Sequence, residues 1–399
     1  MNAAEPTGAP EPADVQQPAH ALDPIRRKTM APLLIASPYP DGHVIVSPGR
    51  EGGVRIGAGL HSQLRDAPPD TLVPDWLIEL ARTGLGAEVS GRRLDGTVLV
   101  RPETGYGYAR ASYELNLGCN FDCEHCYLGE KRFDGLKWPD RQRLLNTIAA
   151  SGVLWLQLTG GEPLIDSLFA RTYQYAWDLG MLIQLSSNGS TLYKPEVLEV
   201  LTARRPYRVT LSIYGGTAES YDAMTRRRGS FNRFMKGLAA AHEAQLPLRI
   251  NIVVSNRNAH EVELMRDIAE CHGAEAFEYT QISPTIHGTG EVLPSQAGEV
   301  RKRLRTPYTG CNAGITHYHA DPHGLASICK IGRQNQVNLV AEGTAGLARL
   351  VEFADAQLTR HGGCTGCGLQ KTCSTCMPLV TLYRQAQAPL DRYCQHGGR

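Results

Sequence analysis

The chain has 399 residues, a formal net charge of +1 and 42% hydrophobic residues, which allows two or three domains with large cores. Basic residues are spread along it, which argues against a nucleic-acid partner, and no stretch approaches the roughly 18 apolar residues of a membrane span. The N-terminus lacks the features of a secretion signal, so the sequence predicts a cytoplasmic location, where eleven cysteines are expected to bind metals rather than form disulfides.

The first 107 residues divide into two parts. Residues 1–30 are rich in Ala, Pro, Glu and Gln and predict a disordered tail. Residues 31–107 predict a small strand-rich domain with a helix at 74–85. Its three short strands, joined by glycine-containing turns, are expected at 32–39, 42–48 and 52–59.

Residues 108–290 show strand-like apolar runs that alternate with amphipathic helical segments. The strands are expected at 112–118, 153–159, 181–187, 207–213, 248–254 and 276–282. Clear helical segments are 140–151, 195–204 and 262–273. Six strands alternating with helices imply a parallel sheet with right-handed crossovers, and the constant order predicts an α/β fold with a partial (β/α)6 TIM-like barrel.

Polar or glycine-rich loops follow the first four of these strands. In such folds the chemistry lies at the carboxyl ends of the strands, so we expect these loops to meet at one rim. They contain the cysteines 119, 123 and 126, the Gly-Gly-Glu-Pro segment 160–163, the Ser-Asn-Gly segment 187–189, and the Tyr-Gly-Gly segment that follows Ser212.

The three cysteines have the spacing C-x-x-x-C-x-x-C, formed by Cys119, Cys123 and Cys126. Three thiolates can hold three irons of a cubane 4Fe-4S cluster and leave the fourth iron open to a ligand that is not protein. The alternative is a zinc site completed by His125 or a distant residue. Zinc does not explain the glycine-rich loop at the next strand end.

This pattern resembles the radical S-adenosylmethionine (radical SAM) enzymes over about residues 110–290. The resemblance rests on the three-cysteine loop with Tyr127 and on "TGGEP" after the next strand. It implies that Cys119, Cys123 and Cys126 ligate a 4Fe-4S cluster whose open iron binds S-adenosylmethionine. It also implies contacts to that cofactor from Tyr127, Gly160, Gly161, Glu162, Pro163, Ser187, Asn188, Ser212 and Arg226.

Two of these residues have plainer interpretations. Ser212 is equally explained as a small residue at a strand end, and the run Arg226–Arg228 as a solvated helix face. No catalytic residue is predicted beyond the radical cluster. Cys271, at the end of a predicted helix, is expected to be a packed core thiol.

Residues 300–399 hold seven further cysteines in a region with little helical periodicity, and they resemble the SPASM domain, which holds two auxiliary 4Fe-4S clusters. The resemblance implies that the outer cluster is ligated by Cys364, Cys367, Cys373 and Cys394, and the inner one by Cys311, Cys329 and Cys376. The chain departs from the family at the last cysteine pair, which is one residue closer, and lacks a cysteine near position 305. A zinc ribbon is the alternative.

The missing thiolate leaves an iron of the inner cluster without a cysteine ligand. A water, the substrate or a side chain of the nearby "THYHADPHG" would occupy that position. This segment offers His317, His319, Asp321 and His323, which are otherwise expected to be exposed turn residues.

The small domain at 31–107 resembles the leader-peptide recognition domain of enzymes that modify ribosomally made peptides. An edge strand would then add the leader as a further strand. The alternative is an extension that shields the barrel. The leading hypothesis is therefore a peptide maturase that uses a 5'-deoxyadenosyl radical to abstract hydrogen from a precursor peptide, forming a thioether or carbon-carbon crosslink or an epimer.

Other functions fit parts of the sequence. The rivals are a sulfatase-maturing type of Cys or Ser oxidation, a small-molecule radical dehydrogenase, and an iron-sulfur electron carrier. A carrier has no use for an open iron. The predicted partners are a precursor peptide and a flavodoxin- or ferredoxin-type electron donor.

Overall fold

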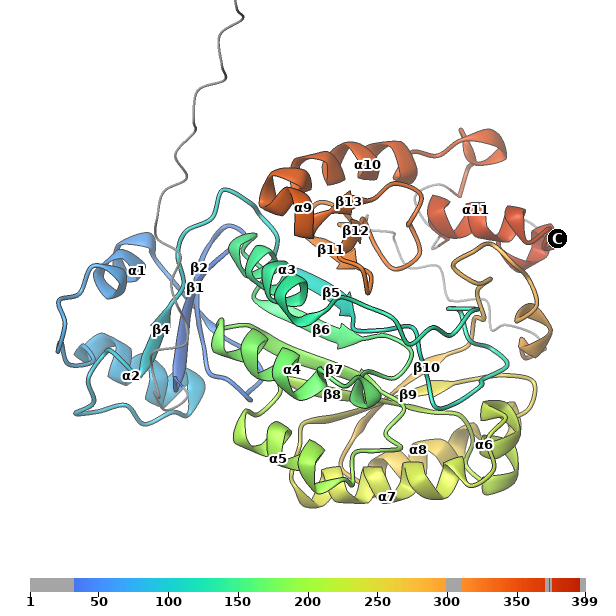
Figure 1. Ribbon diagram of the computed structural model, residues 1–399, viewed down its shortest axis with the longest axis horizontal. Coiled ribbons are helices and arrows are strands. Elements are labelled where there is room, and N and C mark those ends of the chain that lie inside the picture. Colours follow the sequence, from blue (N-terminus) through green and yellow to red (C-terminus); the bar gives the residue numbers. More distant parts are fainter. Residues whose placement is uncertain (1–31, 299–310, 370–372, 374, 395–399) are drawn as a thin grey trace, which may run out of the picture. The chain divides into compact units, whose positions relative to one another are not determined.

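The computed structural model describes residues 32–298, 311–369, 373 and 375–394, all within one compact unit, Ala31–Arg399. The tail predicted at 1–30 lies outside the described residues. Two sheets organise the chain (Figure 1). Within the described part, no helix has the length and apolar character needed to cross a membrane.

The larger sheet contains the six predicted strands in parallel and in chain order. They are β5 (Arg110–Glu114), β6 (Trp155–Thr159), β7 (Leu182–Ser187), β8 (Arg208–Ile213), β9 (Leu248–Val253) and β10 (Glu275–Tyr279). The order β10-β9-β8-β7-β6-β5 continues into three further strands. The described sheet is open, with β10 at one edge, as a partial barrel requires.

Strand β5 ends earlier than predicted. The sequence indicated a strand to residue 118, whereas β5 stops at Glu114. The backbone of the next residues turns toward the loop after β6 instead, where Gly161 donates to the carbonyl of Asn116 at 2.9 Å. The apolar alternation therefore extends past the sheet pairing.

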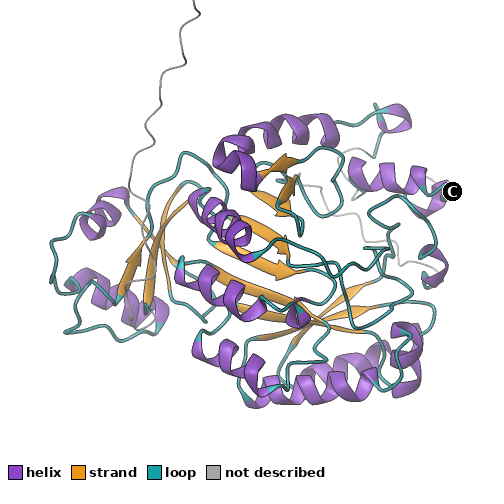
Figure 2. Cartoon of the chain, viewed as in Figure 1, coloured by secondary structure: helices purple, strands orange, loops and turns teal. Residues whose placement is uncertain are grey.

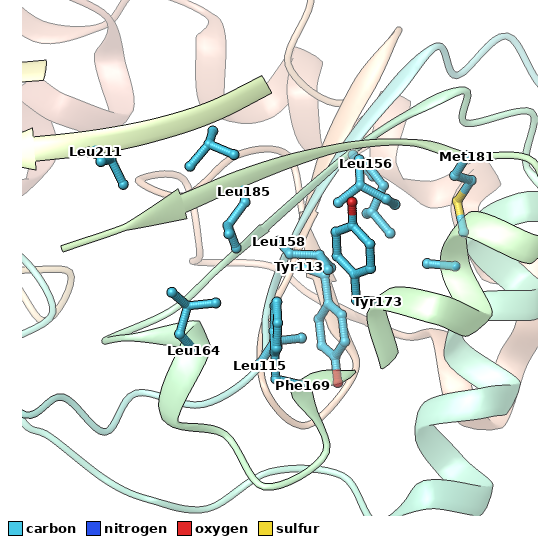
Figure 3. Packing of buried hydrophobic residues seen from close by; sticks show 14 of the residues in the cluster. Tyr113, Leu115, Leu156, Leu158, Leu164, Phe169, Tyr173, Met181, Leu185 and Leu211 are labelled. Carbon is cyan, nitrogen blue, oxygen red and sulfur yellow. The ribbon is translucent and has the colours of Figure 1, made fainter. Parts of the chain in front are cut away.

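Helices follow the strands, as the alternation in Figure 2 shows. They are α3 (Trp138–Ala150), α4 (Phe169–Asp178), α5 (Pro195–Ala203), α6 (Ala218–Thr225), α7 (Ser230–Glu243) and α8 (Val262–Cys271). They pack on one face of the sheet, where alternate strand residues such as Leu156, Leu158 and Leu185 are fully buried (Figure 3). Each such side chain contributes about 1.5–3 kcal/mol by burial.

The opposite face of the same strands is polar. Because side chains alternate along a strand, the residues between the core positions all face this side and pair across it. They include Ser112, Glu114, Gln157, Thr159, Ser186, Thr210, Ser212 and Asn251. Gln157 Nε2 donates to Ser186 Oγ at 2.6 Å. The sheet thus has an apolar face under helices and a hydrogen-bonding face.

The C-terminal region extends this sheet. Strand β11 (His317–Ala320) pairs parallel with β5, and β12 (Leu325–Ser327) and β13 (Val337–Asn338) follow antiparallel. Helices α9 (Leu339–Glu342), α10 (Ala348–Leu358) and α11 (Met377–Gln385) come next. The sequence shows little helical periodicity here, yet α10 and α11 form and bury residues such as Leu350 and Tyr383.

The smaller sheet has the order β3-β2-β1-β4. Its strands are β1 (Leu34–Tyr39), β2 (Gly42–Val46), β3 (Val54–Ile56) and β4 (Val98–Val100), with helices α1 (Ala58–Arg65) and α2 (Asp75–Leu85). The three predicted strands and the predicted helix are confirmed. Helix α1 and the three-residue β4 were missed, because both are too short for a clear periodic pattern.

The smaller sheet is buried on both faces. Leu34, Ala36 and Ile45 pack with α1 and α2. On the other face, Ile35, Val44 and Val46 pack with Leu154 and Leu182. The last two residues lie at the amino ends of β6 and β7, so the small domain contacts the core at the end of the sheet opposite to the cysteine loop.

Short 3-10 helices complete the described secondary structure. They span Pro163–Ile165, Ala259–Glu261, Leu293–Ser295, Gly343–Leu347, Gly362–Cys364 and Leu390–Arg392.

Candidate active site

The three-cysteine loop directly follows β5, and its thiols are half-buried. Burial raises the pKa of Cys119 to about 11, and the pKa of Cys123 rises through burial and through the neighbouring thiols of Cys119 and Cys126. This mutual influence places the three thiols in one neighbourhood on the same loop. Three adjacent thiolates in a partly dry pocket require a cationic group between them, which fits an iron-sulfur cluster or another metal.

Backbone hydrogen bonds hold the cysteine loop against the end of α6. The amide of Asp122 donates to the carbonyl of Thr225 at 2.9 Å, and the amide of Glu124 donates to that of Met224 at 3.1 Å. The loop is therefore positioned by its own backbone before any metal binds.

The Gly-Gly-Glu-Pro loop packs directly against the chain that leads into the cysteine loop. Glu162 N donates to the carbonyl of Gly118 at 2.9 Å. A Cβ at Gly160 would lie 2.2 Å from Asn116 O, and one at Gly161 would lie 2.2 Å from Gly118 O. Both positions therefore require glycine, because the obstacle is backbone. The loop is a backbone cradle beside the thiols.

Glu162 joins the loops after β6 and β7. Its buried carboxylate accepts hydrogen bonds from Ser187 Oγ at 2.8 Å, Asn188 N at 2.7 Å and Leu164 N at 3.1 Å. Burial raises the pKa of Glu162 to about 7, against the opposing effect of these donors. Asn188 Nδ2 in turn donates to Asn120 Oδ1 in the cysteine loop at 2.8 Å. Three of the predicted loops thus meet, and Pro163 lies buried among them.

The remaining predicted cofactor residues lie in different settings. Ser212 lies on the polar face of β8 and hydrogen-bonds with Tyr214. Arg226 is exposed and ends α6 in a left-handed conformation, with φ 50°. The neighbouring Arg227 is the one that contacts the cysteine loop, through Nε to Asn120 O at 3.1 Å.

A buried ion cluster beside the loop was missed by sequence reasoning. Glu114, the last residue of β5, is fully buried and accepts from Arg333 Nη1 at 3.0 Å and Nη2 at 2.8 Å. Tyr127 Oη donates to it at 3.4 Å, and His319 Nε2 lies 3.3 Å away. Burial alone would raise the pKa of Glu114, but His319 and Arg333 hold it well below its usual range.

This cluster corrects one expectation. His319 was expected to be an exposed turn residue, but it lies in β11 with 1% of its side chain exposed. Its Nδ1 is 2.8 Å from Ser112 Oγ. The sequence signal that could have revealed this cluster is Glu114, a carboxylate at the end of an apolar strand and just before the cysteine loop.

The cysteines predicted for the inner auxiliary cluster lie near one another. Burial, reinforced by Cys311, raises the pKa of Cys329. Burial, together with the thiols of Cys329 and Cys311, raises the pKa of Cys376. Cys376 lies more than 40 residues beyond Cys329 in the sequence, so the fold has brought it to the other two thiols.

The cysteines predicted for the outer cluster lie in the last 36 residues of the chain. Cys364, Cys367, Cys373 and Cys394 are all half-buried, and the segments 370–372 and 374 between them lie outside the described residues. Cys394 N donates to Leu390 O at 2.8 Å.

The expectation that Cys271 is a packed core thiol was wrong. The residue is exposed, because α8 turns Met265 and Ala269 toward the core and places its last residue on the outer side.

Comparison with known proteins agrees with this site. Residues 113–268 match the model of the Radical SAM superfamily. The chain is 33% identical over 189 residues to AdoMet-dependent heme synthase of Methanosarcina barkeri, covering 46% of this chain and 54% of that protein. It is 30% identical over 183 residues to mycofactocin maturase MftC of Mycobacterium tuberculosis, covering 45% and 46%. The chain therefore spans about half the length of these curated relatives.

The structural comparison covers more of the chain than the sequence comparisons do. Streptococcus suis SuiB, solved bound to precursor peptide SuiA, superposes with a TM-score of 0.61 at 14% identity, covering 92% of this chain and 99% of that chain. At this identity the likeness concerns the fold. The cysteine loop, the backbone cradle beside it and the matched family model lead to one conclusion: this chain contains a radical SAM domain.

Proposed function

We propose that the chain is a radical SAM maturase of a ribosomally made precursor peptide. The observation that carries this proposal is the small N-terminal sheet packed on the core, with β3 as a strand at its edge. The structural match to SuiB covers 92% of this chain, so it includes at least part of this small domain. The sequence matches to curated relatives cover the part common to enzymes with different substrates, so they do not choose between substrates.

The cysteine loop is suited to the radical cluster. Cys119, Cys123 and Cys126 would ligate a 4Fe-4S cluster, and the cradle of residues 160–163, with Ser187, Asn188 and Ser212, would hold S-adenosylmethionine. When bound, these groups supply the 5'-deoxyadenosyl radical that abstracts hydrogen. The glycine cradle supports this, because a side chain at 160 or 161 would fill the space beside the thiols.

The polar face of the sheet is the surface that would receive the peptide. Strand residues such as Gln157 and Ser186 offer donors and acceptors next to the cysteine loop. A peptide segment lying there would satisfy its backbone groups against these side chains and exclude water from the reacting carbon. The residues bind and orient the peptide, while Glu114 and Arg333 fix the position of the cysteine loop relative to β11.

Two auxiliary 4Fe-4S clusters would occupy the C-terminal cysteines. The proximity of Cys311, Cys329 and Cys376 supports the inner one. We assign the outer one to Cys364, Cys367, Cys373 and Cys394. The domain boundaries that follow are 31–107, 108–290 and 300–399.

The edge strand β3 would bind the leader part of the precursor. It pairs only with β2 among the described strands, and Arg55 in its middle is exposed. A leader strand added here gains affinity from main-chain hydrogen bonds. A sulfatase-maturing enzyme or a small-molecule dehydrogenase has no use for such an edge, which is why peptide maturation is preferred.

The electron donor would be of flavodoxin or ferredoxin type. The exposed Arg227 contacts the cysteine loop, the exposed Arg226 acts on Asp122 in that loop, and the exposed Arg228 follows them in the chain. A positive patch there would steer an acidic donor to the cluster.

The test is cofactor cleavage by the anaerobically reconstituted chain. With reductant and S-adenosylmethionine, it is expected to form 5'-deoxyadenosine, and a variant with Cys119, Cys123 and Cys126 changed to Ala is expected to form none. With a precursor peptide, sought as a short open reading frame beside the gene, a mass change in that peptide is expected. Cleavage that persists in the triple variant contradicts the radical site, and an unmodified peptide contradicts the substrate class.

A further inference from the structure

A second group of metal-ligand side chains lies far from the cysteines, in the N-terminal domain. His43 comes from β2, His61 from α1, and Glu103 from the segment between β4 and β5. His43 Nε2 is 2.7 Å from Glu103 Oε1, and His61 Nδ1 is 3.3 Å from the same oxygen. Among the described residues, this is the group of three whose ligand atoms converge within 4.8 Å.

The buried imidazoles have few partners. His61 is fully buried, and its Nδ1 faces Glu103 at 3.3 Å without a well-aligned hydrogen bond. The backbone at Arg101 lies close enough to act on the ring, but His61 Nε2 and His43 Nδ1 lack a well-aligned partner within the described residues. Unpaired polar atoms in a protein interior are costly, so these nitrogens are available as ligand atoms.

The electrostatics favour neutral imidazole, which is the form that binds metals. Burial lowers the pKa of His61, and the nearby His43 and Arg65 lower it further, against the opposing effect of Glu103. Two stacked imidazoles, with ring centroids 4.3 Å apart, do not accommodate two positive charges. The buried His61 therefore favours the neutral form, beside the carboxylate of Glu103.

We propose that His43, His61 and Glu103 bind a divalent transition-metal ion, with zinc as the best fit. Two imidazoles and one carboxylate are a common zinc ligand set, and solvent completes the tetrahedron. Glu103 is half-exposed, so an ion has a path from solution. The two rings are inclined by 25°, so one ring would turn about its side-chain bonds to bring both nitrogens to the ion.

The site would fasten the domain to the chain that leads into the core. His43 and Glu103 are 60 residues apart in sequence, and Glu103 lies just before β5. An ion between them would close this long loop and fix the small sheet relative to the radical domain. The proposal does not depend on the substrate of the enzyme.

The test is zinc binding by the full chain after its iron-sulfur clusters have been reconstituted, so that cysteines do not compete. A chromophoric chelator measures the affinity, and zinc-edge X-ray absorption identifies the ligands. We expect one zinc with nitrogen and oxygen ligands at ~2.0–2.2 Å and no sulfur at ~2.3 Å. Glu103→Gln and His43→Ala are expected to weaken binding by more than about tenfold, since even outer-shell changes cost that much.

The matched control is His242→Ala. His242 on α7 meets His272, the residue after α8, in an edge-on ring pair with centroids 5.7 Å apart. No converging carboxylate accompanies this pair among the described residues. Its substitution is expected to leave zinc affinity unchanged. Sulfur in the zinc shell, or equal affinity of wild type and Glu103→Gln, overturns the proposal. Glu103→Gln changes a half-exposed side chain, so its fold, checked by circular dichroism, remains intact.

Discussion

Replacing Gly161 with Ala tests the backbone cradle most directly. The added Cβ would lie 2.2 Å from Gly118 O, which is 0.8 Å below the 3.0 Å that real contacts keep. Because the obstacle is backbone, the cysteine loop or the cradle has to move by about that distance. A displacement near 1 Å at a reacting centre costs about 100-fold in rate. We therefore expect about 100-fold slower formation of 5'-deoxyadenosine.

The control is Gly107→Ala, where a Cβ meets nothing within 4 Å. It is expected to retain the wild-type rate. Iron content and the visible spectrum separate loss of the cluster from loss of cofactor positioning. A Gly161→Ala enzyme that holds its cluster and reacts within twofold of wild type would refute the packing argument.

Three further predictions follow from the same geometry. Glu114→Gln is expected to lower the free energy of unfolding by about 3–5 kcal/mol, because it leaves the buried guanidinium of Arg333 without its carboxylate; a loss below 1 kcal/mol in urea melts would contradict this. Changing Arg226 and Arg228 to Glu is expected to slow cluster reduction by flavodoxin several-fold at low salt, with the dithionite rate unchanged; a salt-independent rate would count against docking there. A photo-crosslinker at Arg55 is expected to capture the leader half of the precursor, and capture of the other half alone would exclude leader binding at β3.

The main sheet could be predicted because its periodicity is strong. Core residues alternate with polar neighbours most clearly in β6 and β8, through Leu156 and Leu158 and through Val209 and Leu211. The helices between the strands carry clear apolar faces. The three-residue β4 and the eight-residue α1 could not be predicted, because neither is long enough to show a period. Strand β11 was missed because its core-facing residues are Tyr318 and Ala320 and its opposite face carries histidines, a pattern that does not differ from that of a polar loop.

The site could be predicted where the ligand residues lie within one short segment, because cluster binding requires a fixed spacing between them. The cysteine loop and the glycine loop are local patterns, and the structure brings them together. The contacts of Glu114 could not be predicted, because Arg333 lies 219 residues away and only the pairing of β11 with β5 joins them. The contacts among His43, His61 and Glu103 could not be predicted either, because the three residues come from three separate segments of the chain.

The placement of the small domain sets a length requirement on the substrate. It packs at the amino ends of β6 and β7, through Leu154 and Leu182, whereas the cysteine loop lies at the carboxyl ends. The core strands have five or six residues, or roughly 16–20 Å at about 3.3 Å per residue, and the packed layer adds about 10 Å. An extended peptide needs about nine residues to cover this distance. The modified residue should therefore lie at least that far beyond the segment bound at β3. Deleting residues of the precursor between the leader and the modified residue, until fewer than about nine remain, is expected to abolish modification without weakening leader binding. Modification that survives this deletion would place the leader elsewhere.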